Sequence, residues 1–215
     1  MNPTLTAVQA RVIACLVEKS ITTPQYYPLS VNAVVTACNQ KSSRQPIMNL
    51  SEGEVGATLN QLEELRLAKR EDQISRVPKW RHRFQHELLL KDAPMAVLVT
   101  LMLRGPLTLA ELRASAAPIN GPADTAGVHA ALEDLADRAQ PLVAGLARQP
   151  GQSAQRYTQL ICPDAAEGLQ TGAFEAAPAP EAGVPSLTQR VAYLEQRLAE
   201  LERQLGVEPA PPAAG

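Results

Sequence analysis

The stretch SEGEVGATLNQLEELR, residues 51–66, combines a helix start with a helical stripe of apolar residues. Ser51 followed by Glu54 is the capping-box pattern, in which each side chain satisfies a backbone N–H group beside the other. Val55 and Leu59 then begin an apolar repeat with the period of a helix. The stretch predicts an amphipathic helix with one buried face.

The same pattern returns near the middle of the chain, in DTAGVHAALEDLADRA, residues 124–139. A single offset of 73 residues aligns the apolar positions of the two stretches. A duplicated unit explains this agreement better than chance. The aligned pairs are Val55 with Val128, Ala57 with Ala130, Leu59 with Leu132, and Leu62 with Leu135.

The sequence predicts two helices before residues 51–66 and two strands after them. LTAVQARVIACLVEKS starts with a capping box at Thr6 and Gln9, and LSVNAVVTACNQ has Ser30 as an N-cap. LAKRED and KWRHRF then predict two short strands around the polar tip QISRVP.

The second copy has the same order of elements. DAPMAVLVTLMLRG predicts a capped helix that Gly105 and Pro106 end, and TLAELRASA opens with a capping box at Thr108 and Glu111. PLVAGLAR and AQRYTQLI predict the two closing strands, in which Arg156 takes the place of Arg81. Three helices followed by a strand hairpin, or wing, is the order of a winged helix-turn-helix domain.

The predicted fold is therefore mainly α with small β wings (α+β). It contains two tandem winged helix-turn-helix domains and a C-terminal coiled-coil-like helix. We expect the first domain over residues 1–90 and the second over residues 91–163.

The remainder changes to Ala, Pro, Gly and Glu, which predicts a flexible linker over residues 164–185. We expect residues 186–206 to form an amphipathic helix, because their apolar spacing resembles a coiled-coil seam, and residues 207–215 to form a disordered tail. This helix either joins two chains as a homodimer or packs back on its own domains. Its seam residues are Leu187, Val191, Leu194, Leu198, Leu201 and Leu205.

Composition narrows the functional classes. The chain has 215 residues and a formal net charge of −2, so it lacks the strongly basic balance typical of nucleic-acid binders. Its three cysteines are odd in number and far apart, which suits a reducing cytoplasm and predicts buried apolar roles for all three. No apolar run approaches the length of a membrane span, so we expect a soluble cytoplasmic protein.

Enzyme signatures are missing from the sequence. It contains no phosphate-binding glycine loop, no G-x-S-x-G elbow and no H-E-x-x-H motif. His82 and His86 have a spacing that a metal site can use, but two ordinary strand histidines are the simpler reading. We therefore predict no enzymatic activity and no cofactor. Pro24 and Pro28 fix a turn in which Tyr26 and Tyr27 are expected to cap the core.

Nucleic acid is the remaining partner to weigh, because winged helices often place their third helix in the major groove. Both predicted third helices are acidic, which repels phosphates. The cations lie instead in the turn NQKSSR and near the first wing, where they could bind a DNA backbone weakly and without sequence preference. The alternative for these cations is an ordinary solvated hairpin. The alternative for the whole protein is a protein-interaction scaffold that does not bind DNA. The candidate contact residues are Asn39, Gln40, Lys41, Arg44, Arg70, Arg76, Lys79, Arg81 and Arg83.

The run EKSITTPQYYPLSVNAVVTACNQKSSRQPIMNLSEGEV, residues 18–55, resembles the signature of the YceH family of bacterial proteins. LRGPLTLAELR and RQPGQSAQRY resemble motifs of that family's second domain, so the resemblance covers about residues 4–162. It implies a tandem winged-helix fold. It implies no activity, and no residue inherits a role from it.

Overall fold

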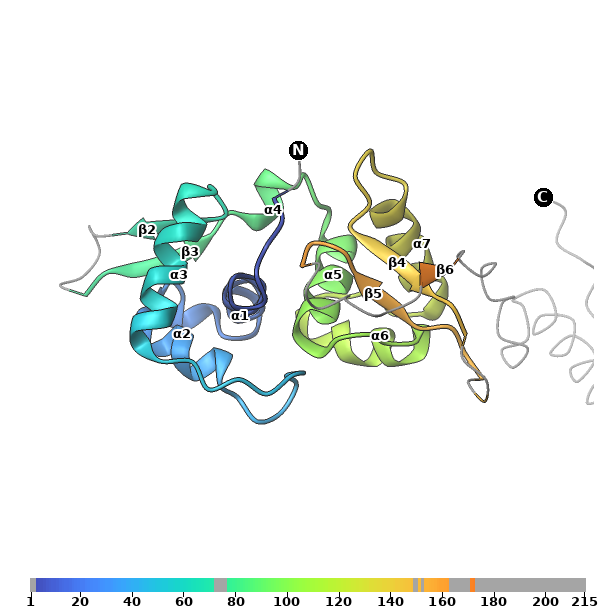
Figure 1. Ribbon diagram of the computed structural model, residues 1–215, viewed down its shortest axis with the longest axis horizontal. Coiled ribbons are helices and arrows are strands. Elements are labelled where there is room, and N and C mark those ends of the chain that lie inside the picture. The colour runs from blue at the N-terminus through green and yellow to red at the C-terminus, as the bar shows by residue number, and fades with distance from the viewer. Residues whose placement is uncertain (1–2, 72–76, 149–150, 152, 163–170, 173–215) are drawn as a thin grey trace, which may run out of the picture. The chain divides into compact units, whose positions relative to one another are not determined.

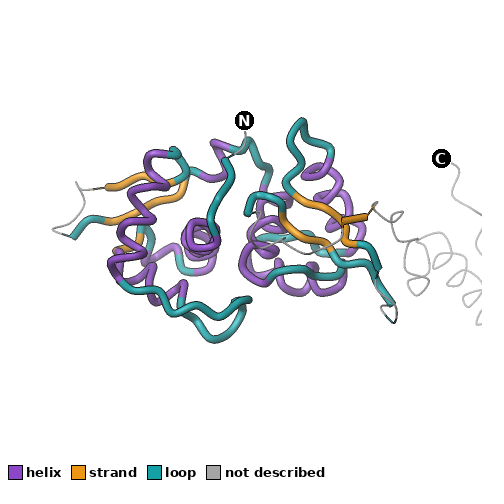
Figure 2. Tube along the Cα trace, in the orientation of Figure 1, coloured by secondary structure: helices purple, strands orange, loops and turns teal. Residues whose placement is uncertain are grey.

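The computed structural model describes residues 3–71, 77–148, 151, 153–162 and 171–172. It is mainly helical with two small antiparallel sheets (Figures 1 and 2). The predicted tail, the coiled-coil seam and Arg76 lie outside the described residues. We refer to residues 3–90 as the first half and to residues 91–162 as the second half.

The first half contains the expected three helices and two strands, with additions. Trp80 on the closing strand pairs with Leu29, which adds a third strand that was not expected, because two residues are too few to show a periodic pattern. A short helix after the hairpin was also missed. The elements are α1 (Ala7–Thr22), the 3-10 helix η1 (Pro24–Tyr26), β1 (Leu29–Ser30), α2 (Val31–Cys38), α3 (Glu52–Glu64), β2 (Ala68–Glu71), β3 (Lys79–His82) and α4 (Phe84–Glu87).

The second half follows the same order. Leu107 forms a bridge with Tyr157, as Leu29 does with Trp80, and each leucine precedes the N-cap of the half's second helix. The elements are α5 (Asp92–Arg104), α6 (Leu109–Ala116), η2 (Ala117–Ile119), α7 (Thr125–Ala136), β4 (Val143–Leu146) and β5 (Tyr157–Gln159).

The pairing corrects one alignment. Since Tyr157 corresponds to Trp80, Arg156 corresponds to Lys79 and not to Arg81. A second correction concerns the linker predicted over residues 164–185. Within it, β6 (Thr171–Gly172) pairs with the edge of β4, because an open strand edge offers backbone groups to any extended segment that reaches it.

The helix signals in the sequence are confirmed. Capping boxes are present at all three expected positions, Thr6, Ser51 and Thr108. Gly105 ends α5 with a φ of 75°, a backbone conformation that a side chain disfavours. Lys91 and not Asp92 is the N-cap of α5, and it makes no side-chain cap.

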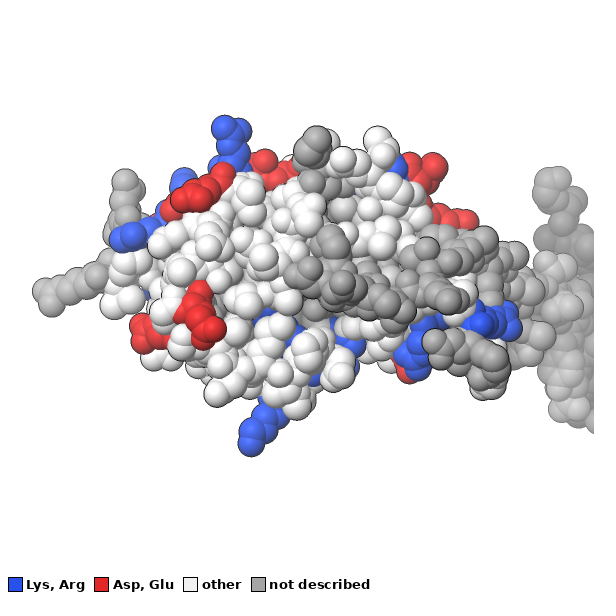
Figure 3. Space-filling view, in the orientation of Figure 1, with Lys and Arg blue, Asp and Glu red and all other residues white. Residues whose placement is uncertain are grey.

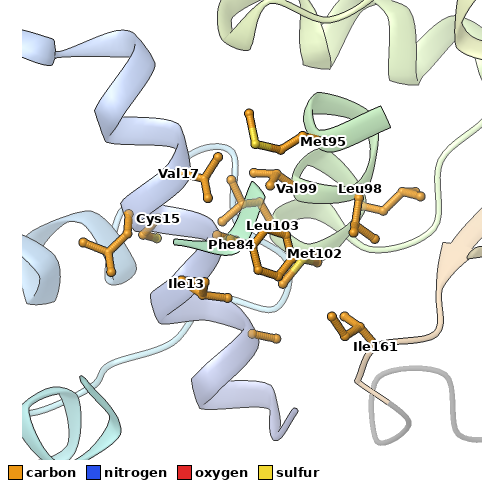
Figure 4. Packing of buried hydrophobic residues seen from close by; sticks show 14 of the residues in the cluster. Ile13, Cys15, Val17, Phe84, Met95, Leu98, Val99, Met102, Leu103 and Ile161 are labelled. Atoms are coloured by element: carbon orange, nitrogen blue, oxygen red, sulfur yellow. The ribbon is translucent and has the colours of Figure 1, made fainter. Parts of the chain in front are cut away.

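The two halves share one hydrophobic core, centred on α1 and α5. Residues 10–17 of α1 and residues 94–103 of α5 are buried without interruption, so each helix is covered on every side. Figure 4 shows Ile13 and Val17 of α1 facing Val99 and Leu103 of α5, with Phe84 between them. None of the described helices is both long and apolar enough to cross a membrane.

Candidate functional site

The connector between α2 and α3, residues 39–51, contains four of the predicted DNA contacts. Arg44 is only 4% exposed. Its guanidinium donates to the two Glu18 carboxylate oxygens at 3.1 and 2.6 Å, and its Nε donates to the carbonyl of Ala37 at 3.1 Å. The expectation that Arg44 reaches a polyanion is therefore wrong, because every part of its charge is used inside the protein.

Asn39 and Gln40 also have structural roles. The side chain of Asn39 accepts from the backbone N–H of Leu50 at 2.8 Å and donates to its carbonyl at 2.9 Å, which closes the connector into a loop. Gln40 accepts a hydrogen bond from Arg44 at 3.0 Å. Of the four connector candidates, Lys41 alone is exposed.

The connector packs against the C-terminal end of α5. The backbone N–H of Gln45 donates to the carbonyl of Leu103 at 2.7 Å, and Arg104 donates to the hydroxyl of Ser43 at 2.7 Å. From α1, Arg11 donates to the carbonyl of Pro46 at 2.7 Å. The polar stretch that interrupts the two helices thus holds the two halves of the chain together.

The hairpin cations are mixed with carboxylates. Arg81 donates to Glu71 at 2.7 Å, and its guanidinium lies 5.5 Å from the centre of the Tyr27 ring. Arg83 lies 3.8 Å from Glu87. Arg70 is exposed and Lys79 is half-buried.

The structure does not gather the predicted contacts into one surface. In Figure 1 the connector lies at the lower edge of the first half, whereas the β2–β3 hairpin lies at its outer, upper side. Figure 3 shows blue and red atoms interspersed at that upper side. On this face, therefore, the turn and the hairpin do not merge into a continuous basic stripe.

The third helices present carboxylates to solvent. α3 exposes Glu52, Glu54, Glu63 and Glu64, and neither α3 nor α7 contains a Lys or Arg. At the end of α7, an open depression of about 650 Å³ is lined by Ala136 and the charged residues Glu133, Asp134, Asp137 and Arg138. Both helices repel phosphate and attract cations.

A second depression, of about 410 Å³, lies where the end of α1 meets η1, β3 and α4. Two spaced histidines and a Tyr-Tyr pair were the only signals of this depression in the sequence. Tyr26 next to it is 71% exposed, so the expectation that it caps the core is wrong, whereas Tyr27 is partly buried. We call this depression the histidine pocket; its lining residues are Ser20, Pro24, Tyr27, Arg81, His82, Gln85 and His86.

Hydrogen bonds in the histidine pocket argue against a serine nucleophile. Ser20 Oγ lies 3.1 Å from His82 Nε2, the arrangement that a catalytic base would need. The single hydroxyl proton is donated to the carbonyl of Val17 at 2.7 Å, so the hydroxyl accepts from the imidazole. His82 therefore donates a hydrogen bond to Ser20 and does not take the proton of its hydroxyl group.

Two ionisable groups of the histidine pocket, His82 and Tyr27, have pKa values shifted toward their neutral forms. Burial, with smaller contributions from the charges of Arg81 and His86, lowers the pKa of His82 to about 4. Burial raises the pKa of Tyr27, whose hydroxyl accepts from the backbone N–H of His82 at 2.5 Å. A search of the described residues finds no group of three or more His, Cys, Asp or Glu side chains that could hold a metal ion.

Comparisons with known proteins give a family but no activity. A family model described as a protein of unknown function, DUF480, matches residues 5–152. A UPF0502 protein YceH from Salmonella paratyphi B is 45% identical over 212 residues, which cover 95% of this chain and 96% of the relative. A UPF0502 protein from Geotalea daltonii is 42% identical over 199 residues, covering 91% and 89%. The chain therefore belongs to the DUF480 family, together with the UPF0502 proteins of the YceH type.

Proposed function

We propose that this protein is a non-enzymatic tandem winged-helix protein whose third helices bind a partner protein with a basic surface. Each half has three helices and antiparallel strands in the winged-helix order, and in each half the leucine before the N-cap of the second helix pairs with the closing strand. This repeated pairing supports the winged-helix assignment beyond the helix count. Because one fold can serve several functions, the partner has to be argued from the surface.

The observation that carries the proposal is the charge of α3 and α7. The third helix is the element that a winged helix usually presents to its target. Here both third helices expose carboxylates and lack cations, so placing them against phosphates costs electrostatic energy. A basic protein surface would gain attraction from the same charges and associate faster.

The proposal is tested by neutralising carboxylates that make no described structural contact. The variant combines Glu52→Gln, Glu64→Gln, Asp134→Asn and Asp137→Asn in the full-length chain. Proteins that co-purify with the wild type in a salt-sensitive manner are expected to be lost with this variant. The control combines Glu87→Gln with Asp92→Asn, which removes two carboxylates outside the third helices, each with one contact, to Arg83 and to Gln85. A set of bound proteins that neither variant changes would contradict the proposal.

DNA-backbone binding is the second candidate, favoured by cations near the connector. Arg104 donates to Ser43, two residues from exposed Lys41. Arg156 donates to the carbonyl of Pro106 at 2.8 Å and pairs with Glu111 at 3.1 Å. Figure 3 shows Lys and Arg atoms along this lower edge of the face. Such contacts would be independent of sequence.

The DNA candidate is separated from the protein candidate by a duplex of mixed sequence. Under the DNA candidate, affinity measured by fluorescence anisotropy falls steeply with salt. The variant combines Lys41→Glu with Arg113→Glu, at the exposed arginine of α6, and is expected to weaken binding for all sequences. Undiminished binding by the variant would exclude this edge. Arg44 is left unchanged, because its burial would confuse a loss of binding with a loss of folding.

We also propose that two chains form a homodimer through the coiled-coil seam predicted in residues 186–206. Placing Asp at two seam positions, Leu194→Asp and Leu201→Asp, would abolish a coiled-coil dimer, since a charge at a seam position is not tolerated. Sedimentation velocity of full-length wild type and variant measures the result. Equal sedimentation of the two proteins would exclude the seam.

A further inference from the structure

Arg11 is a buried cation on α1 whose hydrogen bonds are incomplete. Its side chain belongs to a residue that is only 1% exposed. Its two terminal nitrogens donate to the carbonyls of Cys38 at 3.3 Å and Pro46 at 2.7 Å. Its Nε is also buried, but it has no hydrogen-bond partner among the described residues. A buried N–H group of a charged side chain is costly to leave unpaired, so a further acceptor is favoured here.

The charge of Arg11 is not balanced by a carboxylate. The neighbouring buried arginine, Arg44, donates to both oxygens of the Glu18 carboxylate, at 3.1 and 2.6 Å. In the part of the chain that the structure describes, no ion pair joins Arg11 to an Asp or Glu. A buried cation normally requires an opposite charge, because its own hydration has been lost. Arg11 therefore favours a negative charge from outside the chain.

Arg11 lines a small cavity where the two halves of the chain meet. The cavity has a volume of about 50 Å³, and its walls come from α1, the connector, the C-terminal end of α5, and β5 with the residues that follow it. We call it the Arg11 cavity. Its wall is largely apolar, with Ala10, Leu101 and Met102 among its residues, and no Asp or Glu lines it.

Two further polar side chains of the wall are available to a ligand. The hydroxyl of Thr158, a residue 2% exposed, and the side-chain amide of Gln45 make no hydrogen bond with the described residues. Gln159 is different, because its side chain already accepts from the backbone N–H of Cys162 at 2.8 Å and donates to the carbonyl at 3.2 Å. Together with Arg11, the wall offers three donor groups and no carboxylate, which favours an anion.

We propose that the Arg11 cavity binds one monovalent anion of the size of chloride, which balances the charge of Arg11. Pockets for drug-sized ligands measure about 300 to 1,000 Å³, so this cavity excludes nucleotides and other organic phosphates. A water molecule takes about 30 Å³ in the liquid. The cavity therefore holds a single ion that is slightly larger than water.

The apolar wall determines which anions bind. An entering ion loses its hydration shell, and the donors of the wall replace only part of it. Bromide and chloride lose less hydration energy than fluoride, and the low dielectric of the wall strengthens their attraction to the guanidinium group. Bromide and chloride are therefore expected to bind more tightly than fluoride, and sulfate is excluded by its size and second charge.

The bound anion joins both halves of the chain. Arg11 belongs to the first half, Thr158 lies on β5 in the second half, and Gln45 lies on the connector between α2 and α3. An anion that binds the folded chain and not the unfolded chain stabilises the fold by mass action. Chloride is therefore expected to raise the melting temperature of the protein.

The position of the anion is tested with bromide, whose electrons scatter anomalously. Crystals of the full-length protein are soaked in sodium bromide, and diffraction is measured at the bromine absorption edge. The expected result is an anomalous peak in the Arg11 cavity, within hydrogen-bond distance of Arg11 Nε. A cavity that shows no such peak, whether it is empty or holds only water, overturns the proposal.

The binding energy is tested by thermal unfolding in sodium chloride and in sodium fluoride at equal ionic strength. The melting temperature of the wild type should be higher in chloride, and Arg11→Met should abolish this difference. Thr158→Val keeps the shape of the side chain and the backbone hydrogen bonds, and should weaken chloride binding about tenfold. It decides the question alone if Arg11→Met does not fold.

The control for general effects of salt is Arg113→Met, which removes an exposed arginine of α6. This variant should keep the wild-type difference between chloride and fluoride. A difference of the same size in wild type, Thr158→Val and Arg113→Met would mean that chloride acts outside the Arg11 cavity, and the proposal would be wrong.

Discussion

At the scale of single residues, burial reverses the apparent role of Arg44. In the sequence it stands among Lys, Ser and Gln, as a surface cation does. In the structure its side chain is completely enclosed and forms the ion pair with Glu18. A buried charge is tolerated only when it is paired and hydrogen-bonded, so this arginine stabilises the connector and is not available to a ligand.

Removing Arg44 takes two hydrogen bonds from the carboxylate of Glu18 and leaves it only the Lys19 ammonium, 3.5 Å away. Arg44→Ala is therefore expected to lower the free energy of unfolding by about 3 kcal/mol, measured by urea titration. Lys41→Ala, three positions away but exposed, is the control and should change it by less than about 0.5 kcal/mol. Equal small effects of the two substitutions would show that the Glu18 pair contributes nothing.

His82 gives the stability a pH dependence of known sign. Its pKa falls from the ordinary 6.5 to about 4 in the folded protein, so the unfolded chain takes up the proton first as the pH is lowered. The stability that neutral His82 provides is complete above pH 6.5 and is lost as the pH falls toward 4. The loss is expected to be on the order of 2 to 3 kcal/mol.

The measurement is urea unfolding at several pH values for wild type and His82→Gln. The substitution should flatten the slope between pH 6.5 and pH 4, whereas His86→Gln, at the exposed histidine, should leave it intact. If His82→Gln keeps the wild-type dependence of the unfolding free energy on pH, then other groups produce that dependence.

At the scale of elements, local signals specified the helices. The side chains of Ser51 and Thr108 accept hydrogen bonds from the backbone N–H groups of Glu54 and Glu111, both at 3.3 Å. Those glutamates return hydrogen bonds of 2.8 Å to the N-cap backbone. Each box therefore satisfies two groups that a helix N-terminus otherwise leaves to water.

Thr108→Ala is expected to cost about 1 kcal/mol of unfolding free energy, because it removes the cap of α6 and half of its reciprocal pair. Thermal denaturation followed by circular dichroism measures the change. Thr22→Ala, near the end of α1, where the threonine hydroxyl donates to the carbonyl of Glu18, provides a control outside any N-cap. A cost no larger than the control's would show that the box adds nothing beyond helix propensity.

At the scale of the whole described molecule, the contact between α1 and α5 makes the halves depend on each other. The single tryptophan of the chain, Trp80, is buried in the first half on β3. Leu103 belongs to α5 in the second half and faces α1 (Figure 4). A probe in one half can therefore report on a substitution in the other.

Leu103→Ala is expected to destabilise the protein by about 3 kcal/mol through the cavity that it leaves. Trp80 fluorescence and far-ultraviolet circular dichroism should shift to the same lower urea midpoint, as in a two-state transition. Leu89→Ala, at a leucine that is 82% exposed, should leave the midpoint in place. A Trp80 transition unmoved by Leu103→Ala would mean that the first half unfolds independently.

The sequence predicted the fold class well and the candidate contacts poorly, for the same reason. Helix caps and apolar periods depend on residues three or four positions apart, so Ser51 and Val55 can be read locally. Whether a Lys or Arg side chain is exposed or buried depends on which residues pack over it in the folded protein. Nothing local to Arg44 indicates Glu18, which lies 26 residues earlier, and nothing near Ser43 indicates Arg104, 61 residues later.

By itself, then, the sequence determined the α+β class, the order of the helices, their caps and the acidity of the third helices, all of which follow from short-range patterns. Only the tertiary structure decided that α1 and α5 share one core, that the polar connector packs inside the protein, and that Arg44 is buried against Glu18. Burial and ion pairing are set by residues distant along the chain, and these become neighbours only when the chain is folded.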